Sequence, residues 1–87
     1  MMQIQEMNIQ LVCTLNEWDP FQMGEGNYDT EIADVIQAVH DIDDKEKLAR
    51  KIQAIYEFSF EQVIPLANCR EIAEKLLLIR NSGSCQL

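Results

Sequence analysis

The sequence predicts an all-α protein, a small bundle of about four short helices around one core. Apolar residues recur at three- and four-residue steps in four separate stretches, which is the spacing of amphipathic helices. A chain of 87 residues has room for one core only, and its 47% hydrophobic and 25% charged residues are the balance of a globular protein. We therefore expect a single helical domain over 1–83, followed by a flexible C-terminal tail over 84–87.

The first expected helix covers about residues 2–17. Its apolar residues share one stripe of the helix surface: Ile4, Met7, Leu11, Val12, Leu15 and Trp18. Pro20 ends the helix, and because the residue before a proline is pushed toward extended geometry, Asp19 is expected to begin the turn. Gly24 and Gly26 then mark a loop.

The second expected helix is about a dozen residues long. Its apolar residues again have helical spacing: Ile32, Val35, Ile36 and Val39. Asn27, Asp29 and Glu31 open it, because polar and negative side chains favour the positive end of the helix dipole. The single histidine, His40, falls at its end, where we expect a capping or surface role rather than catalysis.

The third and fourth expected helices each begin at a capping box. Asp43 with Glu46 opens the third helix, and Asn68 with Glu71 opens the fourth, after Pro65 has interrupted the pattern. Their buried stripes comprise Leu48, Ala49, Ile52, Ile55, Tyr56 and Phe60 in the third helix and Ile72, Ala73, Leu76, Leu77 and Ile79 in the fourth. The third should run to 58 or 60, and the polar run over 81–83 should stop the fourth.

The charge of the chain restricts its partners. Seven Lys and Arg against fifteen Asp and Glu give a formal net charge of -8, so nucleic acid and anionic membrane surfaces should repel it, whereas a basic protein should be attracted. No apolar run reaches the roughly 18 residues that cross a bilayer. Three cysteines without C-x-x-C spacing, and no secretory segment ahead of them, indicate a reducing cytoplasm.

No catalytic, cofactor-binding or metal-binding constellation is predicted, and we expect a protein that is not an enzyme. Cys69 lies at a helix start, where the dipole could lower its pKa, but an inert, partly buried thiol is the favoured interpretation. The acids at 41–46 lack the glycine and the distant glutamate of a calcium loop. An enzyme would need His40, Cys69 and acids to converge in one pocket.

The segment around Trp18, Asp19, Pro20 and Phe21 is the least ordinary part of the sequence. In one interpretation Trp18 and Phe21, together with Tyr28, pin the loop to the bundle while Asp19 accepts hydrogen bonds from the turn. In the other the segment is a recognition surface, because Trp and Tyr often anchor interfaces. The candidate partner-binding residues are Trp18, Asp19, Phe21, Tyr28, Asp29, Glu31 and Asp34.

The same residues bring a resemblance. A first helix that ends in N-E-W-D-P, a glycine-containing loop, and Y-D-x-E-I at 28–32 resemble the YugE-like family of small bacterial proteins over nearly the whole chain. This resemblance implies a helical fold and a bacterial cytoplasmic setting, and it implies no active-site residues.

A W-D-P turn before a Y-D helix start is also similar to some bacterial immunity proteins, which neutralise a toxin. Ten of the fifteen acids fall between 17 and 46, where Lys45 is the one base, so an acidic face could cover the basic cleft of a nuclease. We therefore expect a non-enzymatic protein–protein interaction module with an acidic face, or alternatively an immunity protein. A few apolar residues lie outside the four stripes, so monomer and homodimer both stay open: Ile9, Ile42, Val63, Ile64 and Leu78.

Overall fold

Four helices make up the described part of the chain. The computed structural model describes residues 4–24 and 26–85. In chain order the helices are α1 (Ile4–Trp18), α2 (Asp29–Asp41), α3 (Lys45–Phe60) and α4 (Leu66–Cys85), and the described residues contain no strand. The prediction of an all-α fold with about four helices is therefore confirmed.

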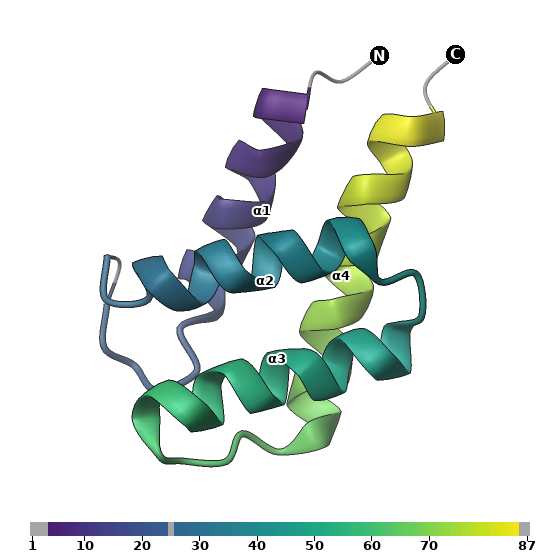
Figure 1. Cartoon of the computed structure of the whole chain (residues 1–87). Helices are drawn as coiled ribbons and strands as arrows, with labels where there is room; N and C mark the ends of the chain where they lie inside the picture. Colours follow the sequence, from purple (N-terminus) through teal and green to yellow (C-terminus); the bar gives the residue numbers. More distant parts are fainter. Residues whose placement is uncertain (1–3, 25, 86–87) are drawn as a thin grey trace.

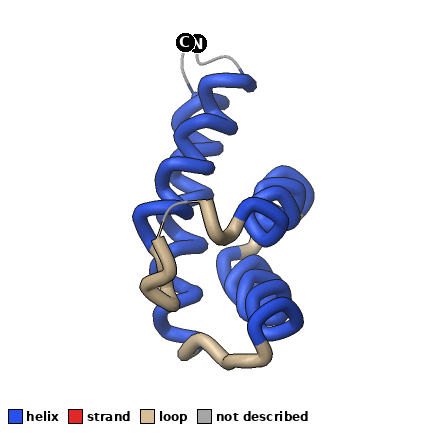
Figure 2. The backbone as a smooth tube through the Cα atoms, turned by 90° about the vertical axis from the view of Figure 1, so that its left-hand side faces the viewer, coloured by secondary structure: helices blue, strands red, loops and turns tan. Residues whose placement is uncertain are grey.

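The helices form two antiparallel pairs. α1 and α4 lie side by side, and the beginning of α1 and the end of α4 are at the same end of the molecule (Figure 1). α2 and α3 form the second pair, which crosses one face of the first (Figure 2). Because α4 packs against all three other helices, and most extensively against α3, it organises the core.

The core lies where the four apolar stripes meet. Each helix contributes side chains without solvent-exposed surface: Leu11 and Leu15 from α1, Val35 and Val39 from α2, Leu48 and Ile52 from α3, and Leu76 from α4. Burying one such side chain contributes about 1.5–3 kcal/mol relative to leaving it exposed. The predicted stripes are thus the residues that hold the two pairs together.

Two helix starts differ from the predicted capping boxes. Asp44, not Asp43, precedes α3, and its Oδ1 accepts a hydrogen bond from the Glu46 amide at 3.1 Å. Adjacent aspartates can both serve as the N-cap, so the apolar pattern of the helix that follows does not indicate which of the two is the cap. α4 begins at Leu66, two residues before the predicted cap Asn68, because the Pro65 carbonyl already accepts the amide of Cys69 at 3.2 Å.

The end of α4 also differs from the prediction. The helix passes through the polar run at 81–83 and ends at Cys85, two residues inside the segment expected as a flexible tail. A glycine inside a helix costs about 1 kcal/mol relative to alanine, but it keeps its amide and carbonyl and so does not force the helix to stop. Residues 86 and 87 of the expected tail lie outside the described residues.

Candidate functional site

Asp19 organises the loop between α1 and α2. Its backbone has a positive φ of 35°, and its carboxylate accepts the amides of Met23 at 2.8 Å and Gly24 at 3.0 Å. The Tyr28 hydroxyl donates to Oδ1 of the same carboxylate and accepts the Phe21 amide at 3.1 Å. The hydrogen bond from Tyr28, with those from the loop amides, lowers the pKa of Asp19. Asp19 therefore satisfies the backbone donors of the turn, as the structural interpretation predicted.

The aromatic residues of this loop pack inward around Tyr56 of α3. The Trp18 ring stands edge-on to Tyr56 at a centroid distance of 5.4 Å, and Tyr28 lies at 5.8 Å. Phe21 and Phe60 complete the cluster at 6.4 and 6.2 Å from Tyr56. Tyr28 and Tyr56 have no exposed surface, so the cluster fastens the loop to the bundle.

The hydroxyl of Tyr56 differs from that of Tyr28. It is buried and has no hydrogen-bond partner among the described residues, whereas the Tyr28 hydroxyl both donates and accepts. Burial, reinforced by the nearby Glu31 carboxylate, raises the pKa of Tyr56. Burial also raises the pKa of Tyr28, and the hydrogen bond to Asp19 adds to the effect. The two tyrosines are thus a matched pair, one satisfied and one not.

The seven candidate partner-binding residues divide into three groups in the structure. Tyr28 and Glu31 are buried, with 0% and 8% of their surfaces exposed. Asp29 and Asp34 on α2 are exposed. The remaining three, Trp18, Asp19 and Phe21, are partly buried in the loop and its cluster. The structure therefore brings the aromatic members together and leaves the two exposed acids on a separate surface.

Of these two acids, Asp34 lines the α2–α3 groove, which we define by Asp34 and Asp41 of α2 and Lys51, Ile55 and Phe58 of α3. It consists of two adjoining hollows of about 380 and 230 Å³ that share Asp34, Lys51 and Ile55. Phe58 stands at one end with 90% of its surface exposed. Sequence reasoning missed Phe58, although its position between Tyr56 and Phe60 lies off the buried stripe.

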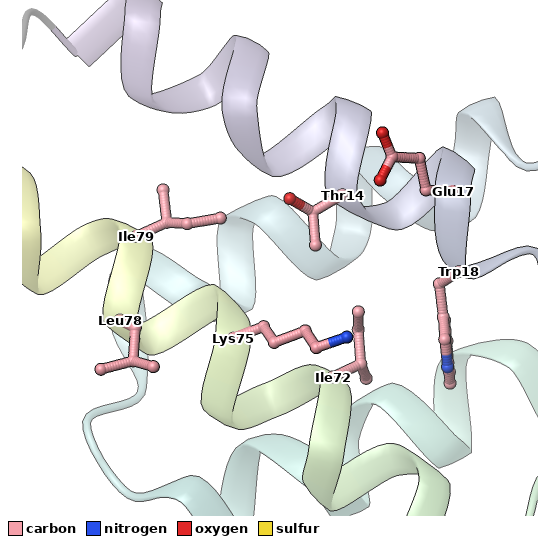
Figure 3. Close-up of a pocket in the computed structure, with 7 residues that line it drawn as sticks. All are labelled: Thr14, Glu17, Trp18, Ile72, Lys75, Leu78 and Ile79. Carbon is pink, nitrogen blue, oxygen red and sulfur yellow. The ribbon is translucent and has the colours of Figure 1, made fainter.

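A larger hollow, the α1–α4 groove, lies between the other two helices (Figure 3). Its volume is about 590 Å³, and Trp18 and Ile72 are among the apolar residues that line it. Glu17 of α1 and Lys75 of α4 stand on opposite sides of it. Leu78 and Ile64 both lie outside the four predicted apolar stripes. Leu78 is 60% exposed in this groove, whereas Ile64 is buried.

The residues considered for chemistry lie in different environments. Cys69 is fully buried, and burial raises the pKa of its thiol to about 11, opposite to the effect of a helix start. His40 is exposed, with Nε2 3.0 Å from Oδ1 of Asn8. The described part of the chain groups no three His, Cys, Asp or Glu residues as a metal site would. None of its helices has the length and hydrophobicity that a bilayer crossing requires.

Comparisons with known proteins place the chain among bacterial relatives. Residues 10–86 match the model of a family described as "Domain of unknown function (DUF1871)". The chain is 51% identical over 76 residues to "Uncharacterized protein YugE" of Bacillus subtilis (strain 168), a match that covers 87% of this chain and 88% of that protein. It also superimposes on the crystal structure of APC36109 from Bacillus stearothermophilus with a TM-score of 0.89 at 40% identity, over 91% of this chain and 98% of that one.

Proposed function

The chain belongs to the DUF1871 family, the group of small bacterial helical proteins that includes YugE, and we propose that it is a non-enzymatic protein–protein interaction module. The proposed binding surface is the α2–α3 groove, and the partner is a protein segment that carries both basic and apolar side chains. The observation that carries the proposal is the 90% exposure of Phe58 in a hollow that Asp34 of α2 also lines.

The charge of α2 supports a basic partner. This helix carries four acids and no Lys or Arg: Asp29, Glu31, Asp34 and Asp41. Asp34 and Asp41 are seven residues apart, so they lie on one face of α2, about 10 Å apart along its axis. Two basic side chains with that separation, as at two turns of a partner helix, would meet both carboxylates. Such charges also speed association.

Phe58 supports a partner that also brings an apolar side chain. A phenylalanine on the surface leaves its ring in water, which is unfavourable unless another molecule covers it. Ile55, one turn earlier on α3, extends the apolar surface into the groove. Aromatic residues that become buried at the centre of an interface often carry much of its binding energy. We therefore assign Phe58 the role of anchor and the α2 acids that of steering.

The experiment is affinity capture from a bacterial extract with the intact chain. The wild-type protein should recover a basic protein reproducibly at low salt, and recovery should fall as salt rises, because the groove acids Asp34 and Asp41 are exposed. Phe58→Ser and the double variant Asp34→Lys/Asp41→Lys should each lose that protein. Recovery of nothing above background at low salt would contradict the proposal.

A matched control separates specific contacts from overall charge. Glu6→Lys/Glu74→Lys changes exposed acids of α1 and α4, and each double variant shifts the net charge from -8 to -4, because every acid-to-lysine exchange adds two positive charges. The control variant should keep the captured protein. If it loses the partner as completely as the groove variant does, the attraction is general and the groove has no special role.

Immunity against a toxin is a narrower form of the same proposal. The acids of α2 would suit the basic cleft of a nuclease, whose own substrate is a polyanion. Under this form a neighbouring reading frame should encode a toxin domain, and co-expression should rescue cells from that toxin. If the neighbouring genes encode only housekeeping proteins, or if co-expression fails to rescue the cells, the immunity hypothesis is excluded. The general proposal of an interaction module would then remain.

A further inference from the structure

We propose that the α1–α4 groove is the interface of a symmetric homodimer, in which the groove of one chain faces the same groove of a second copy. This surface lies apart from the α2–α3 groove, because α2 and α3 cross a single face of the α1 and α4 pair and contribute no residue to the α1–α4 groove (Figure 2). The proposal is therefore independent of the proposed function.

The apolar surface of the groove is the first argument. Leu78, which is 60% exposed, and its chain neighbour Ile79 lie at one end of the hollow between the two helices, and the indole of Trp18 lies at the other end beside Ile72 (Figure 3). The hollow is partly open to solvent, so side chains of a second surface can enter it. Adjoining apolar side chains of this kind gain by being covered, and a rimmed apolar groove is typical of an interface.

The charges of the groove argue for a second copy rather than an unrelated protein. Glu17 and Lys75 are exposed on opposite sides of the hollow, and within the described residues neither makes an ion pair. A surface with one acid on one side and one base on the other is complementary to itself. In a two-fold dimer the same patch serves both subunits, so each contact occurs twice.

The positions of these charges choose the direction of the two-fold axis. If the axis runs along the groove, parallel to the helices, α1 of one chain faces α4 of its partner, and Glu17 meets Lys75 twice. If the axis runs across the groove, α1 faces α1, and the two Glu17 carboxylates approach each other. Since like charges opposite each other cost free energy, the first arrangement is the one we infer.

The distribution of charge among the helices agrees with this arrangement. α1 carries two acids and no base, whereas α4 carries three bases and two acids, so facing α1 with α4 brings opposite net charges together. The four acids of α2 lie in the pair that covers the other face. Much of the net charge of -8 is thus held away from the interface, where salt screens its repulsion.

Sedimentation equilibrium and static light scattering test the dimer on the intact chain. The measured mass should rise with concentration toward twice the 10.1 kDa of one chain, with half-association at about 10–100 µM. Trp18 is the one tryptophan of the sequence, so its emission should shift to shorter wavelength over the same concentrations as the groove is covered. A mass that stays at one chain up to about 1 mM would overturn the proposal.

Charge exchange tests the inferred arrangement itself. Glu17→Lys and Lys75→Glu should each raise the dissociation constant by about tenfold or more, because each places like charges opposite one another at two contacts. Mixing the two variants should restore association, since every contact in the mixed dimer then joins a lysine to a glutamate. The double variant Glu17→Lys/Lys75→Glu should also dimerise. Failure of the mixture to associate would exclude the α1-to-α4 arrangement.

Two further variants separate this interface from the other surface. Leu78→Asp should leave a monomer with unchanged helical circular dichroism, because a carboxylate replaces an apolar side chain that is already exposed. Phe58→Ser is the matched control: it removes the exposed ring of the α2–α3 groove and should keep the dimer mass. A dimer that persists in Leu78→Asp, or one that Phe58→Ser dissociates, would overturn the assignment.

Discussion

Two buried tyrosines provide a residue-scale test of the loop that follows α1. The Tyr28 hydroxyl bonds to Asp19 and to the Phe21 amide, so Tyr28→Phe leaves a carboxylate and a partly buried amide short of a partner. We expect Tyr28→Phe to lower the free energy of unfolding by about 1–2 kcal/mol, measured by urea denaturation.

Tyr56→Phe is the control for that measurement. The Tyr56 hydroxyl is buried and finds no hydrogen-bond partner in the part of the chain that the structure describes, so its removal breaks no hydrogen bond there and relieves an unsatisfied group. The free energy of unfolding should stay unchanged or rise. Equal losses in both variants would mean that the hydrogen bonds of the Tyr28 hydroxyl contribute no more to stability than the unpaired Tyr56 hydroxyl does.

Asp19 predicts a dependence of stability on pH. Its pKa is lowered in the folded state from an ordinary value of 3.8, chiefly by the hydrogen bond from Tyr28. The stabilisation is therefore complete above the unfolded pKa, and it is lost as pH falls through the lower, folded pKa. Asn tolerates the positive φ at this position, so Asp19→Asn keeps the backbone conformation while it removes the charge and one of the two acceptor oxygens. Between about pH 5 and 2, its unfolding free energy should fall less steeply than that of the wild type. If the unfolding free energies of Asp19→Asn and of the wild type fall in parallel over this range, protonation of Asp19 does not contribute to acid unfolding.

At the scale of elements, sequence patterns identified each helix but not its ends. The stripes at 48–56 and 72–79 were recognisable because burial on one side repeats with the helical period. The caps were one and three residues out, since Asp43 and Asp44 have the same chemistry and the carbonyl of Pro65 needs no polar side chain to begin a helix. Local chemistry decides a helix end, and several neighbouring residues can supply it.

Arg80 is an element-scale contact that the sequence did not reveal, because it joins residues about forty positions apart. Its guanidinium, largely buried, donates to the Val39 carbonyl at 2.7 Å and the Ile42 carbonyl at 3.1 Å, where α2 ends. Arg80→Met keeps much of the aliphatic stem but leaves these carbonyls without the donor. We expect the free energy of unfolding to fall by about 1–3 kcal/mol in urea denaturation.

The ion pair of Arg80 with Asp43 serves as the internal comparison. The two groups are 2.8 Å apart, but the Asp43 side chain is 92% exposed, so water and salt screen the attraction. Asp43→Asn should change stability little, and high salt should not mimic the loss in Arg80→Met. A large effect of Asp43→Asn would show that the charge, rather than the cap on α2, is what Arg80 supplies.

At the scale of the whole molecule, the fold class followed from the sequence but the arrangement did not. Four amphipathic stripes required burial against one another, yet nothing in their spacing states that α2 and α3 cross one face of α1 and α4. For the same reason the two grooves could not be predicted, although Leu78 stood out as an unused apolar residue. Of the candidate residues, Asp19 was recognised by its turn chemistry and Tyr28 by its aromatic ring, whereas the exposure of Phe58 became visible only once α3 was in place.

Cys69 predicts how the molecule opens as a whole. It lies in the core with a thiol pKa raised to about 11, whereas Cys13 on α1 is exposed. In a Cys85→Ser background, Ellman's reagent at pH 8 should therefore label Cys13 at once and Cys69 only through opening of the core. If that opening is global, Tyr28→Phe should speed the labelling of Cys69 by about tenfold for each 1.4 kcal/mol of stability lost, with Cys13 unchanged. If Tyr28→Phe leaves the labelling rate of Cys69 unchanged, α4 instead separates locally from α3, without unfolding of the loop that follows α1.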